Sequence, residues 1–349
     1  MVGPENVRAL FKEYGEQIDD GLRSLFDNTP KFDMYAHLAY FMGFRDEQLK
    51  RIDGYGGKRF RSGLCLMLGD WYGKKVETLS VALSVELFHN FSLIHDDIVD
   101  KDTLRRGRPT VWKLWGIPHA INDGDAQLFL AETAVVRGAS DAETKICVLD
   151  FLNSQCIKVI EGQHLDFTLT DLRLNDGEVS EFSYYEMIER KTADLIVAAT
   201  GSAGIVGGVS KEEFDALCAF GKHLGVAYQV CDDVISIWGK ESVTGKRPYN
   251  DIVERKKTLP ILHAYKELDE DGRQKLLEVF NDSKPLSTEE AEKVIVLLES
   301  VNTYEHMRTA VEEHARKAKE IAKTLSITDE QKMTLSSIVD VLLPDIKAV

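Results

Sequence analysis

Proline is scarce in this chain. Only 8 of the 349 residues are proline, and none lies between Pro118 and Pro248. Because proline is the strongest helix breaker, this interval is free to form long helices. The alternating pattern of half-buried strands is also nearly absent, whereas KICVLDFLNSQCIKVIEG and EEFDALCAFGKHLGVAYQVCDDVISIW repeat apolar residues at spacings of three and four. The sequence therefore predicts an all-α fold.

Long apolar runs are missing too. No window approaches the roughly 18 consecutive apolar residues of a membrane span. The N-terminal segment MVGPENVRALFKEYGEQIDD mixes charges of both signs and lacks the apolar core of a secretory signal. With 44% hydrophobic and 29% charged residues, the composition is that of a soluble globular protein. We therefore expect a soluble, cytoplasmic protein.

Cysteine and positive charge are both limited. The 5 cysteines are odd in number and show no CxxC spacing, which indicates neither a disulfide framework nor a zinc site. Lys and Arg total 43 against 58 Asp and Glu, a net charge of −15, so most of the surface would repel a nucleic acid. A polyanionic ligand would need a local basic cluster or a bound cation.

No segment resembles a flexible interdomain linker, although several loops are rich in Gly, Pro, Asn or Asp. We expect one domain over residues 1–349, with the chemical motifs in 57–260 and a peripheral helical portion in 262–349. Two capping boxes, Ser287 with Glu290 and Thr328 with Gln331, predict helix starts in that portion.

Three carboxylates end an apolar helical run in SLIHDDIVDKDTLRRGRP. On a helix, Asp96 and Asp100 lie about 40° apart and Asp97 flanks them. Such a like-charge cluster is destabilising unless it is solvated, protonated or neutralised. Carboxylate oxygens suit Mg²⁺, which commonly shares its coordination with substrate phosphates. For this motif alone, a solvated acidic turn is the favoured interpretation.

A second acidic pair follows in VAYQVCDDVISIWG. Gln229, Asp232, Asp233 and Ser236 occupy positions i, i+3, i+4 and i+7, along one helical face. The two acidic helices could face each other across a pair of metal sites.

Basic residues recur beside the Gly-rich turns and the acidic motifs. Each alone is most often a solvated surface charge, but together they favour a diphosphate-binding cavity. They are Lys58, Arg61, Arg105, Arg106, Lys191, Lys246, Lys256 and Lys257.

In this order, the motifs resemble those of the trans-isoprenyl diphosphate synthases, the polyprenyl synthetase family that includes farnesyl and geranylgeranyl diphosphate synthases. The resemblance runs from about residue 57, within GGKRFR, to KKTLP ending at 260, with GQHLD at 162–166 and KT at 191–192 between them. It implies an isoprenoid-synthase-type helical bundle around a central cavity. It also implies a homodimer, because the family generally pairs through helices.

The resemblance implies two to three Mg²⁺ ions per active site. Asp96, Asp97 and Asp100 would bind Mg²⁺ that bridges to the allylic diphosphate. The second motif, Asp232 with Asp233, would hold a further ion from the opposite wall. Asp166 matches a family acid near the metals, which either binds a metal directly or contacts a residue that does.

Substrate roles follow from the same resemblance. The isopentenyl diphosphate site would be formed by Lys58, Arg61, His89 and Arg106. The allylic diphosphate would contact Arg105, Lys191, Thr192, Gln229, Lys246 and Lys256. For His89, a role as a histidine paired in a helix interface stays open.

The implied reaction is a prenyl transfer. Metals and cations stabilise the departing diphosphate, the allylic C–O bond ionises, isopentenyl diphosphate attacks, and a proton is lost. Dimethylallyl, geranyl and farnesyl diphosphates are the expected allylic substrates. A class I terpene cyclase would lack the second diphosphate site that GGKRFR and His89 indicate. A non-catalytic partner subunit would usually have lost acidic motifs, whereas the first motif here is complete.

Product length should depend on side chains preceding the first motif. Phe91 and Ser92, five and four positions before Asp96, resemble the archaeal type of geranylgeranyl diphosphate synthase, and Phe88 lies one turn earlier. We expect a twenty-carbon product, with farnesyl or longer products as alternatives. For the rings of Phe88 and Phe91, simple packing in the core is the competing role. Ser236 departs from the family pattern, because it replaces the last acid of the second motif.

Overall fold

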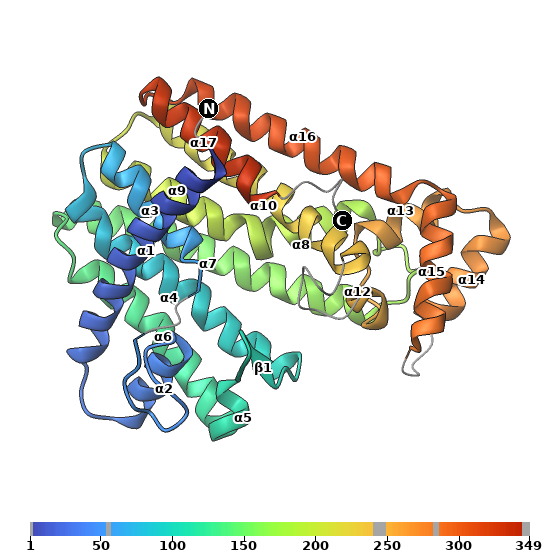
Figure 1. The fold of residues 1–349 in the computed structure, drawn as a ribbon, viewed down its shortest axis with the longest axis horizontal. Coiled ribbons are helices and arrows are strands. Elements are labelled where there is room, and N and C mark those ends of the chain that lie inside the picture. The colour runs from blue at the N-terminus through green and yellow to red at the C-terminus, as the bar shows by residue number, and fades with distance from the viewer. Residues whose placement is uncertain (1–2, 54–56, 240–248, 282–285, 344–349) are drawn as a thin grey trace. The chain divides into compact units, whose positions relative to one another are not determined.

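The computed structural model describes residues 3–53, 57–239, 249–281 and 286–343 (Figure 1). These residues are overwhelmingly helical, and the β-strands among them are two pieces of two residues each. The predicted all-α fold is therefore confirmed. Lys246, one of the predicted diphosphate contacts, lies outside the described residues.

The chain divides into two compact units. Unit 1 comprises Met1–Cys156, Ala198–Cys218 and Ser326–Gln331, and unit 2 comprises Ile157–Val197, Ala219–Leu325 and Lys332–Val349. The division does not follow the boundary expected near residue 261, because each unit is built from separate stretches of chain. The prediction of a single domain stays a prediction.

Unit 1 contains the helices of the N-terminal part. They are α1 (Pro4–Asp27), α2 (Asp33–Phe41), α3 (Phe60–Trp71), α4 (Lys75–Val99), α5 (Val111–Trp115) and α6 (Ile117–Val136). Helices α7 (Ala142–Asp171), α9 (Asp194–Gly207), α10 (Lys211–Trp238) and α17 (Asp329–Leu342) contribute residues to both units.

Helix α4 is the centre of unit 1, packed between α3 and α6. Its stretch from Val81 to Phe88 is buried on every side, as expected of a helix that is apolar around most of its circumference. Burying a single Leu or Phe stabilises the fold by about 1.5–3 kcal/mol. The helix ends at Asp100, whose backbone N–H donates to the carbonyl of Asp96. The first acidic motif is thus the C-terminal turn of a deeply buried helix.

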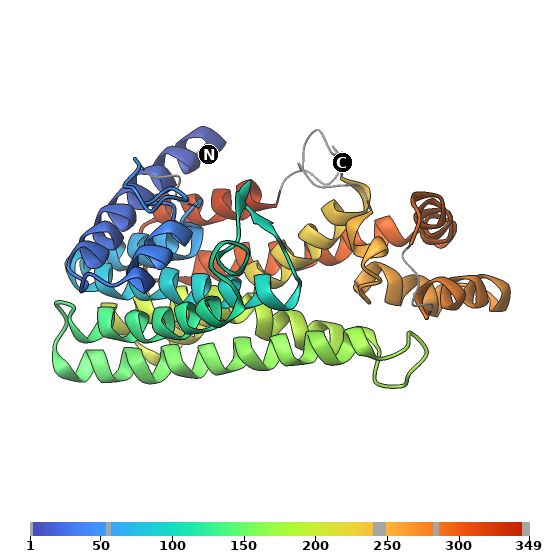
Figure 2. The same cartoon turned by 90° about the horizontal axis from the view of Figure 1, so that it is seen from below.

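A short hairpin connects α4 to α5, shown in teal in Figure 2. Strands β1 (Leu104–Arg105) and β2 (Arg108–Pro109) pair in antiparallel register. The two residues between them, Arg106 and Gly107, have φ values of 53° and 75°. Positive φ at both central residues is the requirement of a type I′ turn, which Gly satisfies without strain.

Unit 2 adds the remaining elements. They are α8 (Glu181–Ile188), the π-helix η1 (Glu189–Ala193), α12 (Asn250–Val253), α13 (Leu259–Glu267), α14 (Glu270–Phe280), α15 (Thr288–Ser300) and α16 (Thr303–Thr324). Their shared core includes Tyr184, Val230, Ile261 and Leu298, all fully buried.

Both predicted capping boxes are confirmed. Ser287 accepts from the backbone N–H of Glu290, whose side chain caps Ser287 in return. Thr328 and Gln331 exchange the same two hydrogen bonds, of 2.8 and 3.3 Å. Across the described ranges, none of the helices has the length and apolar character needed to cross a membrane.

Candidate functional site

The first acidic motif carries one buried carboxylate. Asp97 is 1% exposed, and its Oδ1 accepts a 2.6 Å hydrogen bond from Nε of Arg105. Its Oδ2 is also buried and has no hydrogen-bond partner among the described residues. Burial raises the pKa of Asp97 to about 6, although the charge of Arg105 opposes the increase. A buried, unsatisfied carboxylate oxygen is what a hard divalent cation would need.

Behind this motif, Arg59 forms a fully paired internal ion. Its guanidinium donates to Asp19 at 2.7 Å, to Glu86 at 2.8 Å and to the Met42 carbonyl at 2.9 Å. Arg59 also begins α3 with a φ of 46°. Burial alone would raise the pKa of Glu86, but the charges and hydrogen bonds of Arg59 and its neighbours lower it to about 2. Arg59 therefore has a structural role within GGKRFR.

Asn90 connects this buried pair to Arg106. Its amide donates to the backbone carbonyl of Glu86 at 2.7 Å and to the Glu86 carboxylate at 3.0 Å. The Asn90 carbonyl oxygen accepts from Arg106 at 3.5 Å. A Cβ at Gly57 would lie 3.2 Å from the Arg106 guanidinium, so this glycine allows the arginine to pack across it.

Of the four predicted isopentenyl diphosphate contacts, Arg106 lies in the hairpin turn, and the other three lie at the start of α3 and on α4. Arg61 donates to Nε2 of His89 at 3.4 Å, and Lys58 is exposed. Burial, followed by the positive charge of Arg61, holds the pKa of His89 well below its usual range. Neutral His89 therefore carries its proton on Nδ1, which is buried without a hydrogen-bond partner in the described structure.

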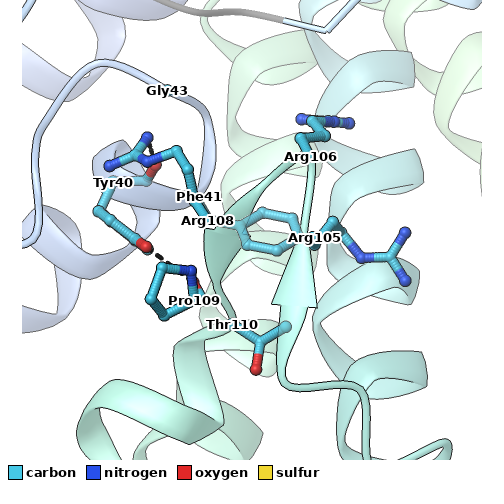
Figure 3. A pocket seen from close by; sticks show the side chains of 8 residues that line it. All are labelled: Tyr40, Phe41, Gly43, Arg105, Arg106, Arg108, Pro109 and Thr110. Atoms are coloured by element: carbon cyan, nitrogen blue, oxygen red, sulfur yellow. Dashed lines mark hydrogen bonds between the residues drawn. The ribbon is translucent and has the colours of Figure 1, made fainter. Parts of the chain in front are cut away.

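Three arginines line a hollow beside the hairpin (Figure 3). Its walls are Tyr40, Phe41, Gly43, Arg105, Arg106, Arg108, Pro109 and Thr110. Arg108 stacks 4.1 Å from the Tyr40 ring and donates to the carbonyls of Tyr40 and Arg45. Figure 3 shows the guanidinium groups of Arg105 and Arg106 pointing away from Arg108. The hollow therefore supports the hairpin and does not focus three charges on one anion.

The predicted chain-length residues lie one and two turns before the acidic motif. Phe88 and Phe91 are 4% and 6% exposed, and their rings meet edge to face at 6.4 Å. Ser92 is half-buried and donates to the carbonyl of His89. Both rings are in the core, which is compatible with packing and with a floor role.

In unit 2, the second acidic pair separates into two environments. Asp233 is 4% exposed, and both its oxygens accept hydrogen bonds, from Gln229 at 2.9 Å and Tyr184 at 2.5 Å. Burial and the nearby charge of Asp251 raise its pKa. Asp232 is only half-buried, and its charge acts on both Asp233 and Asp251. Asp232 therefore fits a metal better than Asp233, whose predicted ligand role stays a prediction.

Ser236 stands where the family pattern has an acid. Its hydroxyl donates to the buried carboxylate of Asp251. Lys256 lies 4.0 Å from Asp251 and 2.9 Å from Glu254. A carboxylate at position 236 would confront Asp251 at close range, so the serine avoids a like-charge contact.

The predicted KT pair occupies the π-helix η1. Lys191 contacts Asp166 at 2.5 Å, and Thr192 donates to Gln229 at 2.8 Å. A single π-turn inside a helical segment frequently marks a functional site. Lys257 differs from these residues, because its ammonium is buried and donates to the Thr170 carbonyl.

Metal binding is supported by the chemistry of the acids. Within the described residues, no three His, Cys, Asp or Glu side chains already converge on a metal position. In unit 1, the unsatisfied Asp97 oxygen fits a hard cation. In unit 2, the half-buried carboxylate of Asp232, which repels Asp233 and Asp251, does so too.

Sequence reasoning missed several supporting residues. Glu86 and Asn90 lie four apart on the helix that carries the acidic motif, and this spacing could have marked them. Asp251 lies five residues before Lys256, one of the predicted diphosphate contacts. Tyr184 gave no signal, because a tyrosine within a helical segment usually packs in the core.

Comparisons with known proteins identify the family. Residues 46–298 match the model of the Polyprenyl synthetase family. The chain is 34% identical to a short chain isoprenyl diphosphate synthase of Methanothermobacter thermautotrophicus, over 97% of this chain and 98% of that protein. It is 31% identical to a geranylgeranyl diphosphate synthase of Methanosarcina mazei, over 83% and 88%. The crystal structure of geranylgeranyl pyrophosphate synthetase from Pyrococcus horikoshii aligns with a TM-score of 0.84 at 30% identity, over 97% and 98%. The chain belongs to the polyprenyl synthetase family.

Proposed function

We propose that this chain is a Mg²⁺-dependent trans-prenyltransferase that condenses isopentenyl diphosphate with an allylic diphosphate, chiefly to geranylgeranyl diphosphate. Asp97 carries the proposal. It is a buried carboxylate on the final turn of α4, with one oxygen on Arg105 and the other without a partner in the described residues. This arrangement suits a site that receives a divalent cation together with a diphosphate.

The chain's own residues have separable roles in this reaction. Mg²⁺ held by Asp96, Asp97 and Asp100, and a further ion held by Asp232, would neutralise charge that develops on the departing diphosphate. Arg105 and Lys191 supply further positive charge to its oxygens. Lys58, Arg61 and Arg106 bind isopentenyl diphosphate, and neutral His89 donates a hydrogen bond from Nδ1. Apolar side chains exclude water, which would otherwise quench the allylic cation.

The twenty-carbon product is supported by the two phenylalanines. Phe91 and Phe88 precede Asp96 by about 7.5 and about 12 Å along the axis of α4, and both are buried. A relative named as a geranylgeranyl diphosphate synthase is 31% identical. We expect Phe88→Ala or Phe91→Ala to lengthen the product. Leu87→Ala, on the same helix and fully buried, controls for general loss of packing.

The decisive assay supplies isopentenyl diphosphate and Mg²⁺ with each of the five-, ten- and fifteen-carbon allylic diphosphates. Product length is measured by chromatography after dephosphorylation. Absence of condensation by the purified chain would reject the proposed function, and a main product of fifteen carbons would reject the proposed chain length. Unchanged product length in both phenylalanine variants would reject the floor role.

We also propose that the chain forms a homodimer through α6. Ile117, Ile121, Phe129 and Val136 are 45–65% exposed and occupy one side of this helix. Large apolar side chains grouped in this way are typical of a protein interface. Size measurement in solution tests the proposal, with Phe129→Glu expected to give monomers.

A further inference from the structure

The π-helix η1 is in backbone contact with two glycines. A Cβ built on Gly162 of α7 would overlap the backbone nitrogen of Lys191 and lie 2.7 Å from its Cα. A Cβ built on Gly225 of α10 would overlap the Cα of Ala193 and lie 2.7 Å from its Cβ. Carbon atoms prefer separations of about 3.5–4.0 Å, so alanine at either position would displace η1 by roughly 1 Å.

Side chains from α7 and α10 hold η1 from the same two helices. Arg190 pairs with Glu161 and Lys191 with Asp166, both on α7. On α10, Lys222 lies 2.8 Å from Glu189, and Gln229 accepts from Thr192. All these residues belong to unit 2. Every residue of η1 thus contacts one of the two helices through its side chain or through its backbone.

The π register has a direct consequence for the KT pair. The N–H of Asp194 donates to the carbonyl of Glu189, five residues earlier, which inserts one extra residue into the helical path. Without that residue, Lys191 and Thr192 would rotate by roughly 100° relative to the preceding turn. Contacts of Lys191 with Asp166 and of Thr192 with Gln229 therefore depend on η1 keeping its place.

We infer that Gly162 and Gly225 are positioning residues for the allylic diphosphate site. They allow α7 and α10 to pack closely against η1, and this packing fixes the directions of the Lys191 and Thr192 side chains. The inference deepens the proposed function and rests on it. Neither glycine is expected to touch the substrate. Their effect acts through the backbone of the KT pair.

The test compares Gly225→Ala with Gly69→Ala. Gly69 lies in α3 of unit 1, where a new Cβ would lie 2.5 Å from Cβ and Cγ2 of Thr78, so its crowding involves a side chain away from η1. A misplacement of about 1 Å at a reacting group can cost about 100-fold in rate. We expect Gly225→Ala to raise KM for the allylic diphosphate and to lower kcat, so that kcat/KM for this substrate falls about 100-fold in total. KM for isopentenyl diphosphate should stay near the wild-type value.

Two further measurements keep the test informative if Gly225→Ala folds poorly. Lys222→Met removes one contact to η1 without crowding, and should raise KM for the allylic diphosphate severalfold while the melting temperature is unchanged. Hydrogen exchange of the ligand-free enzyme should accelerate in the 187–194 segment of Gly225→Ala and not in Gly69→Ala.

The outcomes separate the two proposals. If wild-type protein fails to condense the substrates, the proposed function fails, whatever the variants do. If wild type is active and Gly225→Ala affects both substrates as Gly69→Ala does, with unchanged exchange at 187–194, the positioning inference is overturned.

Discussion

Glu86 offers a sharp test of how unit 1 is held together. Its carboxylate is 3% exposed and accepts from Arg59, Ser62 and Asn90. The substitution Glu86→Gln keeps the shape and removes the charge that faces Arg59. Breaking a buried ion pair typically costs about 3–5 kcal/mol, because the remaining charge is left uncompensated.

The pH dependence gives an independent magnitude. The pKa of Glu86 falls from 4.5 to about 2 in the folded protein. Because the folded pKa is depressed, the stabilisation is fully present above pH 4.5 and is lost as pH falls toward 2. The shift corresponds to about 3 kcal/mol at pH 7, and to about 1.4 kcal/mol at pH 3.

Thermal unfolding followed by circular dichroism at pH 7 and pH 3 measures the stabilisation that the Glu86 carboxylate contributes. We expect Glu86→Gln to lower Tm by about 5 °C at pH 7 and by less than half as much at pH 3. Glu77→Gln lies on the same helix and is the control. The Glu77 side chain is partly exposed and its ion pair with Lys74, at 3.4 Å, lies at the surface, so the Tm of this variant should match wild type. A Glu86→Gln variant as stable as wild type at pH 7, or a Tm difference that does not shrink at pH 3, would refute the reasoning.

Three other predictions concern the site. Gly107→Ala should lower the free energy of unfolding by about 1 kcal/mol, because the φ of 75° at this position disfavours a side chain. The variant should also raise KM for both diphosphates. KM values equal to those of wild type would show that the hairpin turn does not position its arginines. Asp232→Asn should reduce turnover at least about 100-fold, the effect of losing several kcal/mol of charge stabilisation. Asp233→Asn should reduce turnover far less, because the amide keeps most of the hydrogen bonds to Gln229 and Tyr184. Equal losses of turnover in the two variants would show that both acids bind metal. Asp166→Asn should increase affinity for inorganic pyrophosphate without Mg²⁺ in calorimetry, since it removes the partner of Lys191; unchanged or weaker binding would contradict that explanation.

Periodicity was sufficient to predict the helices and the placement of the acidic motifs. The apolar run that ends at Asp96 and the face that carries Asp232 are local features, so spacing of three and four residues defines them. The capping boxes at Ser287 and Thr328 are local in the same sense. All of these interactions join residues within one or two turns.

The turn at Arg106 could not be predicted from periodicity. The Gly and Pro of LRRGRPTVW indicate a loop, yet Leu104–Arg105 and Arg108–Pro109 pair as strands around a two-residue turn. The Arg-Gly sequence is an unusual choice, because a non-glycine residue must adopt positive φ.

Long-range partners were hidden for a different reason. Within GGKRFR the sequence does not distinguish an internal arginine from a ligand-binding one, whereas the three internal contacts of Arg59 do. Similarly, Asp232 and Asp233 are adjacent and chemically identical, and one of the contacts that distinguish them comes from Tyr184, 49 residues away from Asp233. The π register of η1 depends on glycines of two other helices.

A common feature of both units is that cations predicted to bind diphosphate are already paired with carboxylates. Arg105 donates to Asp97, and Lys191 to Asp166. In a chain of net charge −15, these pairs reduce the attraction of bare anions to the site. On the proposed function, a divalent cation that shared the oxygens of Asp97 would weaken the hold of this carboxylate on Arg105 and would leave the guanidinium available to a diphosphate. Because such coupling is reciprocal, bound diphosphate must strengthen metal binding by the same factor. On the proposed function, the pairs would favour the metal–diphosphate complex over either component alone.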